Sequence, residues 1–302
     1  MPVVPAARRL GIAASNLSPG IHPDDVHLMQ FLQDKGIEPI PANWNDPQVD
    51  WSVFDAILIR TTWDYFQQYA QFLAWLAQIE QLGIPTINPL RLLRWNSDKR
   101  YLLQLRQHGV DIIPTQVMGA AELSNALGPM RGTDVVIKPT VSGTAWHTVR
   151  GTAGSPTLNA AICELPRHMD YLIQPFMPEI EREGELSLLF FDNVFSHAVR
   201  KRPAANDYRV QSEFGGSVEI VTPDATVVAA AQRSLLAVAQ LGYEDGSYAR
   251  IDGVLSAGRF LIMEVEMIEP ALYFEGDAAA AQRFADVIER RLSLLRPLSL
   301  LA

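Results

Sequence analysis

Three carboxylates near the C-terminal end of the chain have the types and spacing of a metal site. Asp252 lies in one alternating segment, and Glu264 and Glu266 lie two residues apart in the next. Like charges that face one another across a sheet are destabilising, and buried unpaired carboxylates cost more. Mg²⁺ would resolve this conflict, because it binds a few carboxylates together with substrate phosphates. A solvent-facing polar surface, partly neutralised by Arg250, is the alternative that this segment leaves open.

The element that must position these side chains is a β-hairpin. Residues alternate in both arms, as in half-buried strands. The connection at Ser256–Gly258 predicts a three-residue loop with glycine in the left-handed conformation. Residue 256 then faces residue 260, so Asp252 lies opposite Glu264, and Arg250 lies opposite Glu266 on the same face.

Two lysines upstream stand where a cation is unusual. Lys99 falls in the first turn of a helix predicted to begin at Ser97 or Asp98, where a cation opposes the helix dipole unless both bind one anion. Lys138 interrupts an apolar strand, and a lysine there is rarely buried unless paired. The small, hydroxyl-rich loop at 140–145 can bring backbone amides close to phosphate oxygens, although it is not a Walker A sequence. These features favour phosphate binding.

A further polar group follows a predicted strand of the N-terminal part. Strand–helix alternation over about the first 90 residues predicts a small doubly wound α/β domain, and such sheets bind ligands beyond the carboxyl ends of their strands. An ordinary helix cap is the alternative interpretation of the polar group. The residues that predict a pocket for a small zwitterion are Arg60, Thr61, Trp63, Asp64 and Tyr65.

Composition excludes several classes of function. The 302 residues suggest two or three units that share clefts. A net charge of −9 without a basic tract argues against non-specific nucleic-acid binding. The single Cys163 excludes an intrachain disulfide framework and a Cys-based zinc site, which fits a reducing cytosol. No apolar run approaches the roughly 18–20 residues of a membrane span, so we expect a soluble, cytoplasmic protein.

In order and spacing, these features resemble the ATP-grasp superfamily of carboxylate–amine ligases, which includes glutathione synthetase and D-alanine–D-alanine ligase. The likeness covers nearly the whole chain. It implies an α/β (α+β) ATP-grasp fold, in which two α+β subdomains clasp ATP behind an N-terminal doubly wound domain. The implied units are an N-terminal domain at 1–95, a central subdomain with the phosphate loop at 96–175, and a C-terminal subdomain with the metal site at 176–302.

The resemblance also implies nucleotide-binding residues. Lys99 and Lys138 resemble the two lysines that hold ATP phosphates, and Ser142, Gly143 and Thr144 resemble the mobile loop that closes over them. A strand and a Pro-broken linker match the hinge that binds adenine and ribose, although an ordinary interdomain hinge would look the same. The residues implied there are Gln174, Phe176 and Met177 for adenine, and Glu181 or Glu185 for ribose.

At the reaction centre the resemblance implies metal and acyl-phosphate contacts. Asp252, Glu264 and Glu266 resemble the ligands of two Mg²⁺ ions, although the family usually has Asn where Glu266 stands. Arg200, in the basic sequence Arg-Lys-Arg, resembles the arginine that steadies the acyl-phosphate. Lys138 and the loop at Ser142 and Gly143 complete the implied catalytic set.

Within the superfamily, the segments at 60–65 and 264–270 resemble the branch that contains the D-cycloserine synthetase, which closes O-ureido-D-serine into D-cycloserine. The implied reaction activates a small amino-acid-like carboxylate as an acyl-phosphate, which a nitrogen then attacks. A peptide-type ligase that joins two amino acids, a phosphotransferase and a non-catalytic nucleotide-binding module are the alternatives. We expect no nucleic-acid or membrane partner, and homo-oligomers occur among similar enzymes.

Overall fold

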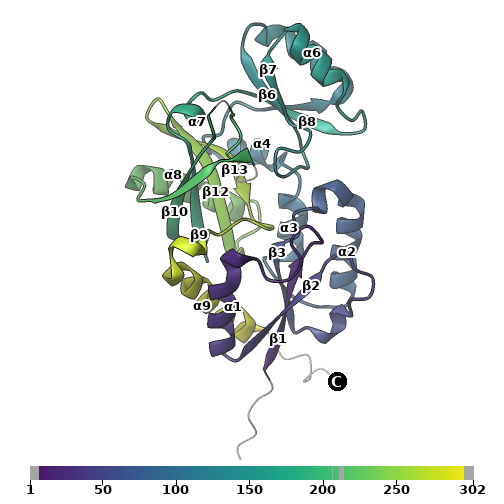
Figure 1. Cartoon of the computed structure of the whole chain (residues 1–302), viewed down its shortest axis with the longest axis vertical. Coiled ribbons are helices and arrows are strands. Elements are labelled where there is room, and N and C mark those ends of the chain that lie inside the picture. Colours follow the sequence, from purple (N-terminus) through teal and green to yellow (C-terminus); the bar gives the residue numbers. More distant parts are fainter. Residues whose placement is uncertain (1–6, 206, 211–213, 296–302) are drawn as a thin grey trace, which may run out of the picture.

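The computed structural model describes residues 7–205, 207–210 and 214–295, which contain three β-sheets (Figure 1). The first sheet is parallel, in the order β2-β1-β3-β4. Its strands are β1 (Arg8–Ala14), β2 (Ile37–Asn43), β3 (Ala56–Thr61) and β4 (Thr86–Ile87). This sheet confirms the predicted doubly wound N-terminal domain.

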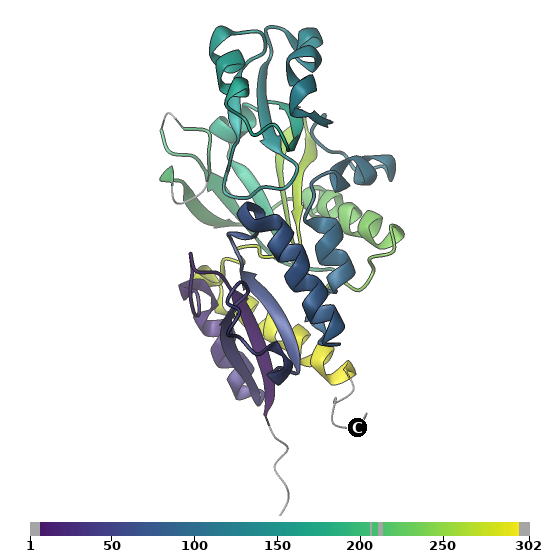
Figure 2. The same cartoon turned by 90° about the vertical axis from the view of Figure 1, so that its right-hand side faces the viewer.

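Helices cover both faces of this sheet because alternate residues of β3 are apolar on both sides. Ala56 and Leu58 pack in one core with α1 (Val26–Asp34) and α9 (Ala278–Leu294), whereas Ile57 and Ile59 pack in another with α2 (Tyr69–Gln81). A continuous apolar run is typical of a strand that is buried on both faces. The chain therefore returns at its C-terminal helix to complete the N-terminal domain (Figure 2).

The second sheet is antiparallel and forms the upper lobe in Figure 1. Its order is β5-β8-β6-β7, and its strands are β5 (Gln116–Gly119), β6 (Asp134–Pro139), β7 (Val149–Thr152) and β8 (Asp170–Pro175). The helices α5 (Leu123–Ala126) and α6 (Pro156–Cys163) share one apolar core with it. Ser155 caps α6 by accepting the Leu158 amide, which fixes where the helix begins.

The third sheet is antiparallel, in the order β11-β10-β9-β12-β13. Its strands are β9 (Glu185–Phe191), β10 (Val194–Arg202), β11 (Ser217–Val221), β12 (Tyr248–Ser256) and β13 (Arg259–Glu266). The Ala-rich helix α8 (Ala225–Gln240) packs against it, together with α3 (Leu90–Asn96) and α4 (Tyr101–Gln107). The short helix α7 (Glu179–Arg182) links the second and third sheets.

The three sheets lie within the three predicted residue ranges, but the helices around them do not. The helices α3 and α4 pack on the third sheet, although the sequence places them at the boundary of the first and second units. Lys99 precedes α4 rather than lying in its first turn. The remaining short 3₁₀ segments are η1 (Pro23–Asp25), η2 (Trp51–Val53), η3 (Tyr65–Gln68), η4 (Ala120–Glu122), η5 (Gly128–Met130) and η7 (Phe274–Gly276).

The β12–β13 hairpin has the predicted charge pairs but reaches them differently. Asp252 pairs with Glu264, and Arg250 pairs with Glu266. The loop has two residues rather than three, because Ser256 pairs with Arg259 and both Ala257 and Gly258 have positive φ. A bulge after Asp252 shifts the register by one residue and restores the predicted pairs. The predicted loop was wrong, and the bulge compensates for that error.

Candidate functional site

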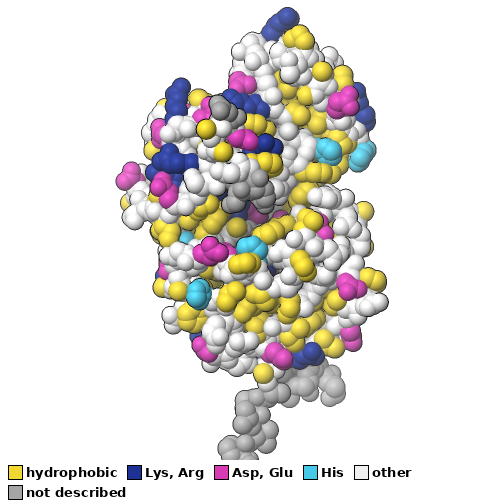
Figure 3. Space-filling view, in the orientation of Figure 1, with side chains coloured by type: hydrophobic (Ala, Val, Ile, Leu, Met, Phe, Trp, Pro, Cys, Tyr) yellow, Lys and Arg dark blue, Asp and Glu magenta, His cyan; other side chains and the backbone are white. Residues whose placement is uncertain are grey.

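A cavity of about 1060 Å³ is lined by residues of the second and third sheets and by residues of the N-terminal domain that lie outside its strands. The second sheet supplies Lys138 and Gln174, the third supplies the charged faces of β10, β12 and β13, and the N-terminal domain supplies Trp63 and Tyr65. In the space-filling view the surface is hollowed between the upper and lower lobes (Figure 3). A cleft enclosed by three units can exclude water from a reaction at its centre.

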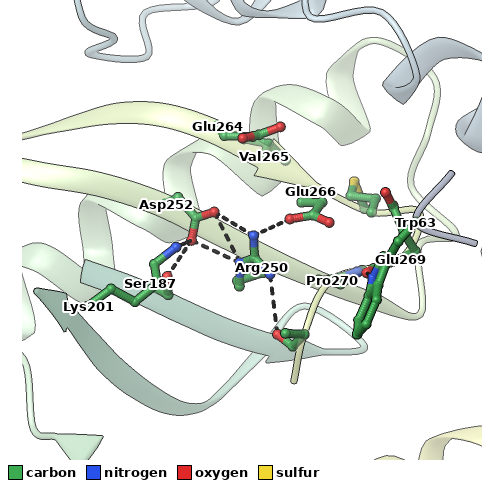
Figure 4. A network of polar contacts seen from close by, with 12 residues as sticks. Trp63, Ser187, Lys201, Arg250, Asp252, Glu264, Val265, Glu266, Glu269 and Pro270 are labelled. Carbon is green, nitrogen blue, oxygen red and sulfur yellow. Dashed lines mark hydrogen bonds and ion pairs between the residues drawn. The ribbon is translucent and has the colours of Figure 1, made fainter. Parts of the chain in front are cut away.

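A network of ion pairs occupies the floor of this cavity (Figure 4). The Arg250 guanidinium donates to both oxygens of Asp252, at 3.0 Å from Nε and 2.9 Å from the terminal nitrogen, and also pairs with Glu266. Lys201 Nζ pairs with Glu185 and lies 3.5 Å from Asp252. The Ser187 hydroxyl donates to Asp252 as well. Asp252 is therefore held by Arg250 on its own strand, by Ser187 on β9 and by Lys201 on β10.

The pKa values of these acids diverge because their partners differ. Although burial opposes it, attraction to Arg250 and Lys201 holds the pKa of Asp252 well below its usual range. Burial, with repulsion from Glu264 and Asp252, raises the pKa of Glu266 to about 7 despite its pairing with Arg250. Burial likewise raises the pKa of Glu185. The centre thus holds more carboxylates than its cations neutralise fully.

These carboxylates fit a hard divalent cation by their chemistry. Asp252, Glu264 and Glu266 project into the cavity from adjacent strands, and the raised pKa of Glu266 reflects negative charge that a cation would relieve. In the described part of the chain, no group of three or more His, Cys, Asp or Glu side chains is close enough together to hold a metal ion without rearrangement. Arg250 lies between Asp252 and Glu266, where it supplies part of the positive charge (Figure 4).

The structure brings both predicted phosphate lysines to the cavity. Lys99 lies 3.1 Å from Glu264 and donates to the backbone oxygen of Ser142. Burial lowers the pKa of Lys138, because desolvation disfavours an ammonium group, and attraction to Glu264 offsets this only in part. Glu264 keeps its pKa below the usual range, despite burial, through attraction to Lys99 and Lys138. A polyanion bound here would stabilise the ammonium form of Lys138.

The loop after β6 lies between these lysines and the N-terminal domain. Ser142, Gly143 and Thr144 line the cavity, and Thr144 has a positive φ of 48°. A Cβ added at Gly143 would lie 2.6 Å from the Phe66 ring, so glycine permits the loop to pack there. The centroids of the Trp146 and Phe66 rings are also 5.5 Å apart. The predicted phosphate loop is thus packed against the domain opposite.

The predicted hinge residues reach the cavity in part. Gln174, Phe176 and Met177 line it, and Gln174 is held by donating to the Thr115 hydroxyl at 2.9 Å. Of the two acids predicted for ribose, Glu185 lines the cavity, but Lys201 pairs with it. Glu181 instead lies in a separate recess, 2.6 Å from the Arg150 guanidinium.

The prediction for Arg200 is contradicted by the alternation of β10. Val199 and Lys201 face the cavity, whereas Arg200 faces the opposite way and lies 3.4 Å from Glu219. The adjacent Lys201 and the arginine of the next hairpin, Arg250, supply the cations at the centre instead. The basic sequence at 200–202 correctly indicated a cation at the site, but it did not show which of its residues faces the cavity.

The predicted zwitterion pocket is corrected in the same way. Arg60 is 2% exposed and is saturated by Asp25 and by the backbone oxygen of Pro270, outside the cavity lining. Asp64 accepts from the Trp44 indole at 2.6 Å, and the Thr61 hydroxyl donates to a backbone oxygen. Trp63 and Tyr65, the two aromatic residues of the five, are the ones that line the cavity.

Several cavity residues were not predicted from the sequence. His22 lies edge-on to Trp63 with ring centroids 5.1 Å apart, and Tyr273 and Glu269 complete that end of the cavity. Arg250 was noted only as a partner of Glu266. The sequence could have indicated that Arg250 belongs to the site, because it stands two residues before Asp252 and therefore lies on the same strand face. His22 and Glu269 lie outside the helices and strands, where the sequence pattern does not predict the direction of a side chain.

Comparison with known proteins gives a consistent picture. Residues 10–88 match the family model of the D-cycloserine synthetase DcsG, N-terminal domain. The chain is 30% identical over 299 residues to the cycloserine biosynthesis protein DcsG of Streptomyces lavendulae, covering 94% of this chain and 98% of that protein. It superimposes on a crystal structure of D-cycloserine synthetase DcsG with a TM-score of 0.85, at 29% identity over 94% and 99% of the two chains.

More distant structures share the fold. A D-alanine–D-alanine ligase from Bacillus anthracis complexed with ATP matches with a TM-score of 0.63, at 17% identity over 95% of this chain and 98% of that one. The ATP-grasp ligase PsnB complexed with its minimal precursor, Mg and ADP matches with a TM-score of 0.59, at 16% identity over 94% and 98%. No helix in the described ranges is both long and apolar enough to cross a membrane. The chain belongs to the family of the D-cycloserine synthetase DcsG, and it is an ATP-dependent ligase with the ATP-grasp fold.

Proposed function

We propose that this enzyme closes O-ureido-D-serine to D-cycloserine and converts ATP to ADP and phosphate. The observation that carries the proposal is the 30% identity to DcsG over almost the full length of both chains. The cavity supports it, because one enclosed space joins phosphate-binding lysines, a charged centre and a small aromatic pocket. The pocket beside Trp63 and Tyr65 suits a compact amino acid.

In this proposal ATP binds along the second sheet. Lys99 and Lys138 hold the phosphates with the loop of Ser142, Gly143 and Thr144, because phosphates supply the counter-charge that Lys138 lacks. The adenine lies toward the hinge, against Gln174, Phe176 and Met177. The ribose lies near Glu185 rather than Glu181, since the latter is outside the cavity.

Two Mg²⁺ ions would be held by Asp252, Glu264 and Glu266, and would supply positive charge between these carboxylates and the phosphates. Arg250 is held beside the same carboxylates, and Lys201 is fixed by Glu185 and Asp252. Fixed cations in a water-excluding site stabilise the charge that develops as a phosphoryl group is transferred. We assign this role to Arg250 and Lys201 in place of Arg200.

The reaction has two steps at the substrate carboxylate. A carboxylate oxygen attacks the γ-phosphorus and ADP leaves, so the carboxyl carbon becomes an acyl-phosphate. The nitrogen bonded to the side-chain oxygen then attacks that carbon, closes the five-membered ring and releases phosphate. This nitrogen still bears a carbamoyl group, so free product also requires hydrolysis of that group to carbon dioxide and ammonia. The loop carrying Trp146 excludes water from the acyl-phosphate.

The test is a substrate panel assayed with Mg-ATP. O-ureido-D-serine, its L-enantiomer, D-alanine, and common amino acids singly and in pairs are each assayed for ADP, phosphate and ammonia. Equal amounts of the three products with O-ureido-D-serine alone are the expected result. Stimulation only by pairs, without ammonia, would indicate a peptide-type ligase. ATP binding with no turnover by any member would contradict the proposed reaction.

The metal assignment has its own test. Glu264 pairs only with Lys99 among the described residues, so Glu264→Gln removes a carboxylate with little disturbance of the Arg250 network. We expect turnover to fall at least about 100-fold at fixed Mg²⁺, corresponding to about 2.7 kcal/mol of lost charge stabilisation. The matched exposed variant Glu80→Gln should keep its activity. An unchanged Mg²⁺ dependence in Glu264→Gln would remove the residue from the metal set.

A further inference from the structure

One buried carboxylate of the cavity has no partner in the described part of the chain. Glu269 is 6% exposed and lines the cavity, but its side chain makes no ion pair and no hydrogen bond to another described residue. The other buried acids of the lining have partners: Glu185 pairs with Lys201, Asp252 pairs with Arg250, and Asp24 accepts from the amide of Glu275. The half-buried Glu264 and Glu266 pair with Lys99 and Arg250. An unpaired buried carboxylate costs free energy unless something neutralises it.

The backbone that carries Glu269 is held firmly in place. The Tyr248 hydroxyl donates to the oxygen of Ile268 at 2.7 Å, the Trp63 indole donates to the oxygen of Glu269 at 3.1 Å, and Arg60 donates to the oxygen of Pro270 at 2.9 Å. Three consecutive carbonyls are therefore fixed by side chains of the N-terminal and third sheets. A carboxylate on such a segment is pre-organised to bind a ligand.

Glu269 lies at the substrate end of the cavity rather than at the phosphate end. In the close-up view it stands beside Trp63, on the far side of Glu266 from Asp252 (Figure 4). Burial, followed by repulsion from Glu266, raises the pKa of Glu269 well above its usual range, and attraction to Lys99 does not offset them. Burial and the nearby Glu269 also raise the pKa of Tyr65. The carboxylate thus lacks a cation at the point where a substrate would enter.

We propose that Glu269 receives the α-ammonium group of the amino-acid substrate while the substrate carboxylate faces Arg250 and the phosphates. This inference rests on the proposed function, because it requires an amino acid in the cavity. A buried ammonium needs an anionic partner, and the other buried carboxylates of the cavity already have a partner each. Binding the two charged ends of the substrate at two fixed points orients the carboxylate for phosphoryl transfer.

The test compares two substrates in two enzymes. O-ureido-D-serine carries the ammonium group, and 3-(ureidooxy)propionic acid lacks only that group. The wild-type enzyme should prefer the first by at least about 100-fold in kcat/KM, since a site built for a polar group rejects its absence. In Glu269→Gln we expect kcat/KM for O-ureido-D-serine to fall at least about 100-fold, with the analogue changed less than about threefold, so the preference disappears.

The controls separate the possible failures. Glu275→Gln changes a carboxylate that also lines the cavity but is exposed, and it should keep the preference, because a solvated carboxylate contributes little to selectivity. Glu269→Met should lose the preference as Glu269→Gln does, and covers the case in which one variant does not fold. A variant that folds and keeps the wild-type preference overturns this inference alone. Wild-type enzyme that does not turn over O-ureido-D-serine overturns the proposed function and this inference with it.

Discussion

Two buried arginines, Arg60 and Arg250, each bind a carboxylate through several hydrogen bonds, yet their surroundings differ. Arg60 meets one acid, Asp25, and its remaining donors are used by a backbone oxygen away from the cavity lining. Arg250 meets two acids, Asp252 and Glu266, and lines the cavity beside further unneutralised negative charge.

The difference shows that burial of a charge does not by itself mark a functional site. The Arg60–Asp25 pair is buried outside the cavity lining, where no ligand can reach it, so it can only fix the structure. The network around Arg250 includes Glu266, whose pKa is raised by burial and by repulsion from neighbouring acids, and a ligand can change that balance. Arg60 still serves the site indirectly, because it holds the carbonyl of Pro270.

The largest effect is expected at Arg250. Arg250→Met removes the cation between Asp252 and Glu266, and we expect kcat to fall about 100- to 1,000-fold because the developing charge loses a fixed donor. Phosphate release under saturating ATP measures it. Arg200→Met is the matched control, since its side chain faces away from the cavity. A larger loss in Arg200→Met than in Arg250→Met would return the catalytic arginine to position 200.

Arg60 should give the opposite outcome. Arg60→Met leaves Asp25 buried without its partner, and removing one member of a buried ion pair typically costs about 3–5 kcal/mol in the free energy of unfolding. Urea unfolding measures this loss. The activity of the enzyme that remains folded should fall much less than in Arg250→Met. An unfolding free energy within error of wild type would show that the Arg60–Asp25 pair is not structural.

An intermediate effect is expected at Gly143, where the phosphate loop meets the N-terminal domain. Gly143→Ala places a Cβ 2.6 Å from the Phe66 ring, and overpacking typically costs about 1–3 kcal/mol. We expect KM for ATP to rise about 10-fold, because the loop can no longer pack in this position. Phe66→Leu in the same protein should restore part of the affinity. In Gly128→Ala the added Cβ meets nothing within 4 Å, so its KM should not change.

Much of this arrangement could be predicted from the sequence because it follows from strand periodicity. The apolar run of β3, the lysine that interrupts β6 and the charge pairs of the β12–β13 hairpin are local patterns, and the structure contains them all. The hairpin pairs survived an error in the loop, since the bulge after Asp252 shifted the register back. Alternation is informative wherever one strand face is buried.

The failures concern side-chain direction, which tertiary contacts decide. Arg60 lies near the end of β3 and Asp64 follows it, and tertiary partners far along the chain hold both side chains in the core. Arg200 and Lys201 are adjacent cations, and only the position of β9 and β11 on either side decides which one faces the cavity. Glu269 follows β13 outside any strand or helix, so the sequence alone does not predict the direction of its side chain.

The smallest effect is a pH dependence of stability in the protein without metal or nucleotide. The pKa of Glu266 is about 7 in the folded protein, above the ordinary value of about 4.3 for the unfolded chain. Between those values the folded state binds the proton more tightly, so stability rises as pH falls from 8 to 6 and is lost as pH rises through 7. For one group the gain is about 1 kcal/mol.

Glu266→Gln removes this contribution together with the part of the raised pKa of Glu269 that repulsion from Glu266 causes, whereas the lowered pKa of His197 remains in both proteins. Urea unfolding of both proteins at pH 6 and pH 8 with EDTA should show a smaller pH difference in Glu266→Gln. The exposed variant Glu38→Gln should keep the wild-type difference. Parallel pH dependences in wild type and Glu266→Gln would mean that Arg250 neutralises Glu266 fully. The Arg250 network would then be as saturated as the Arg60–Asp25 pair, and the contrast between the two arginines would rest on the cavity alone.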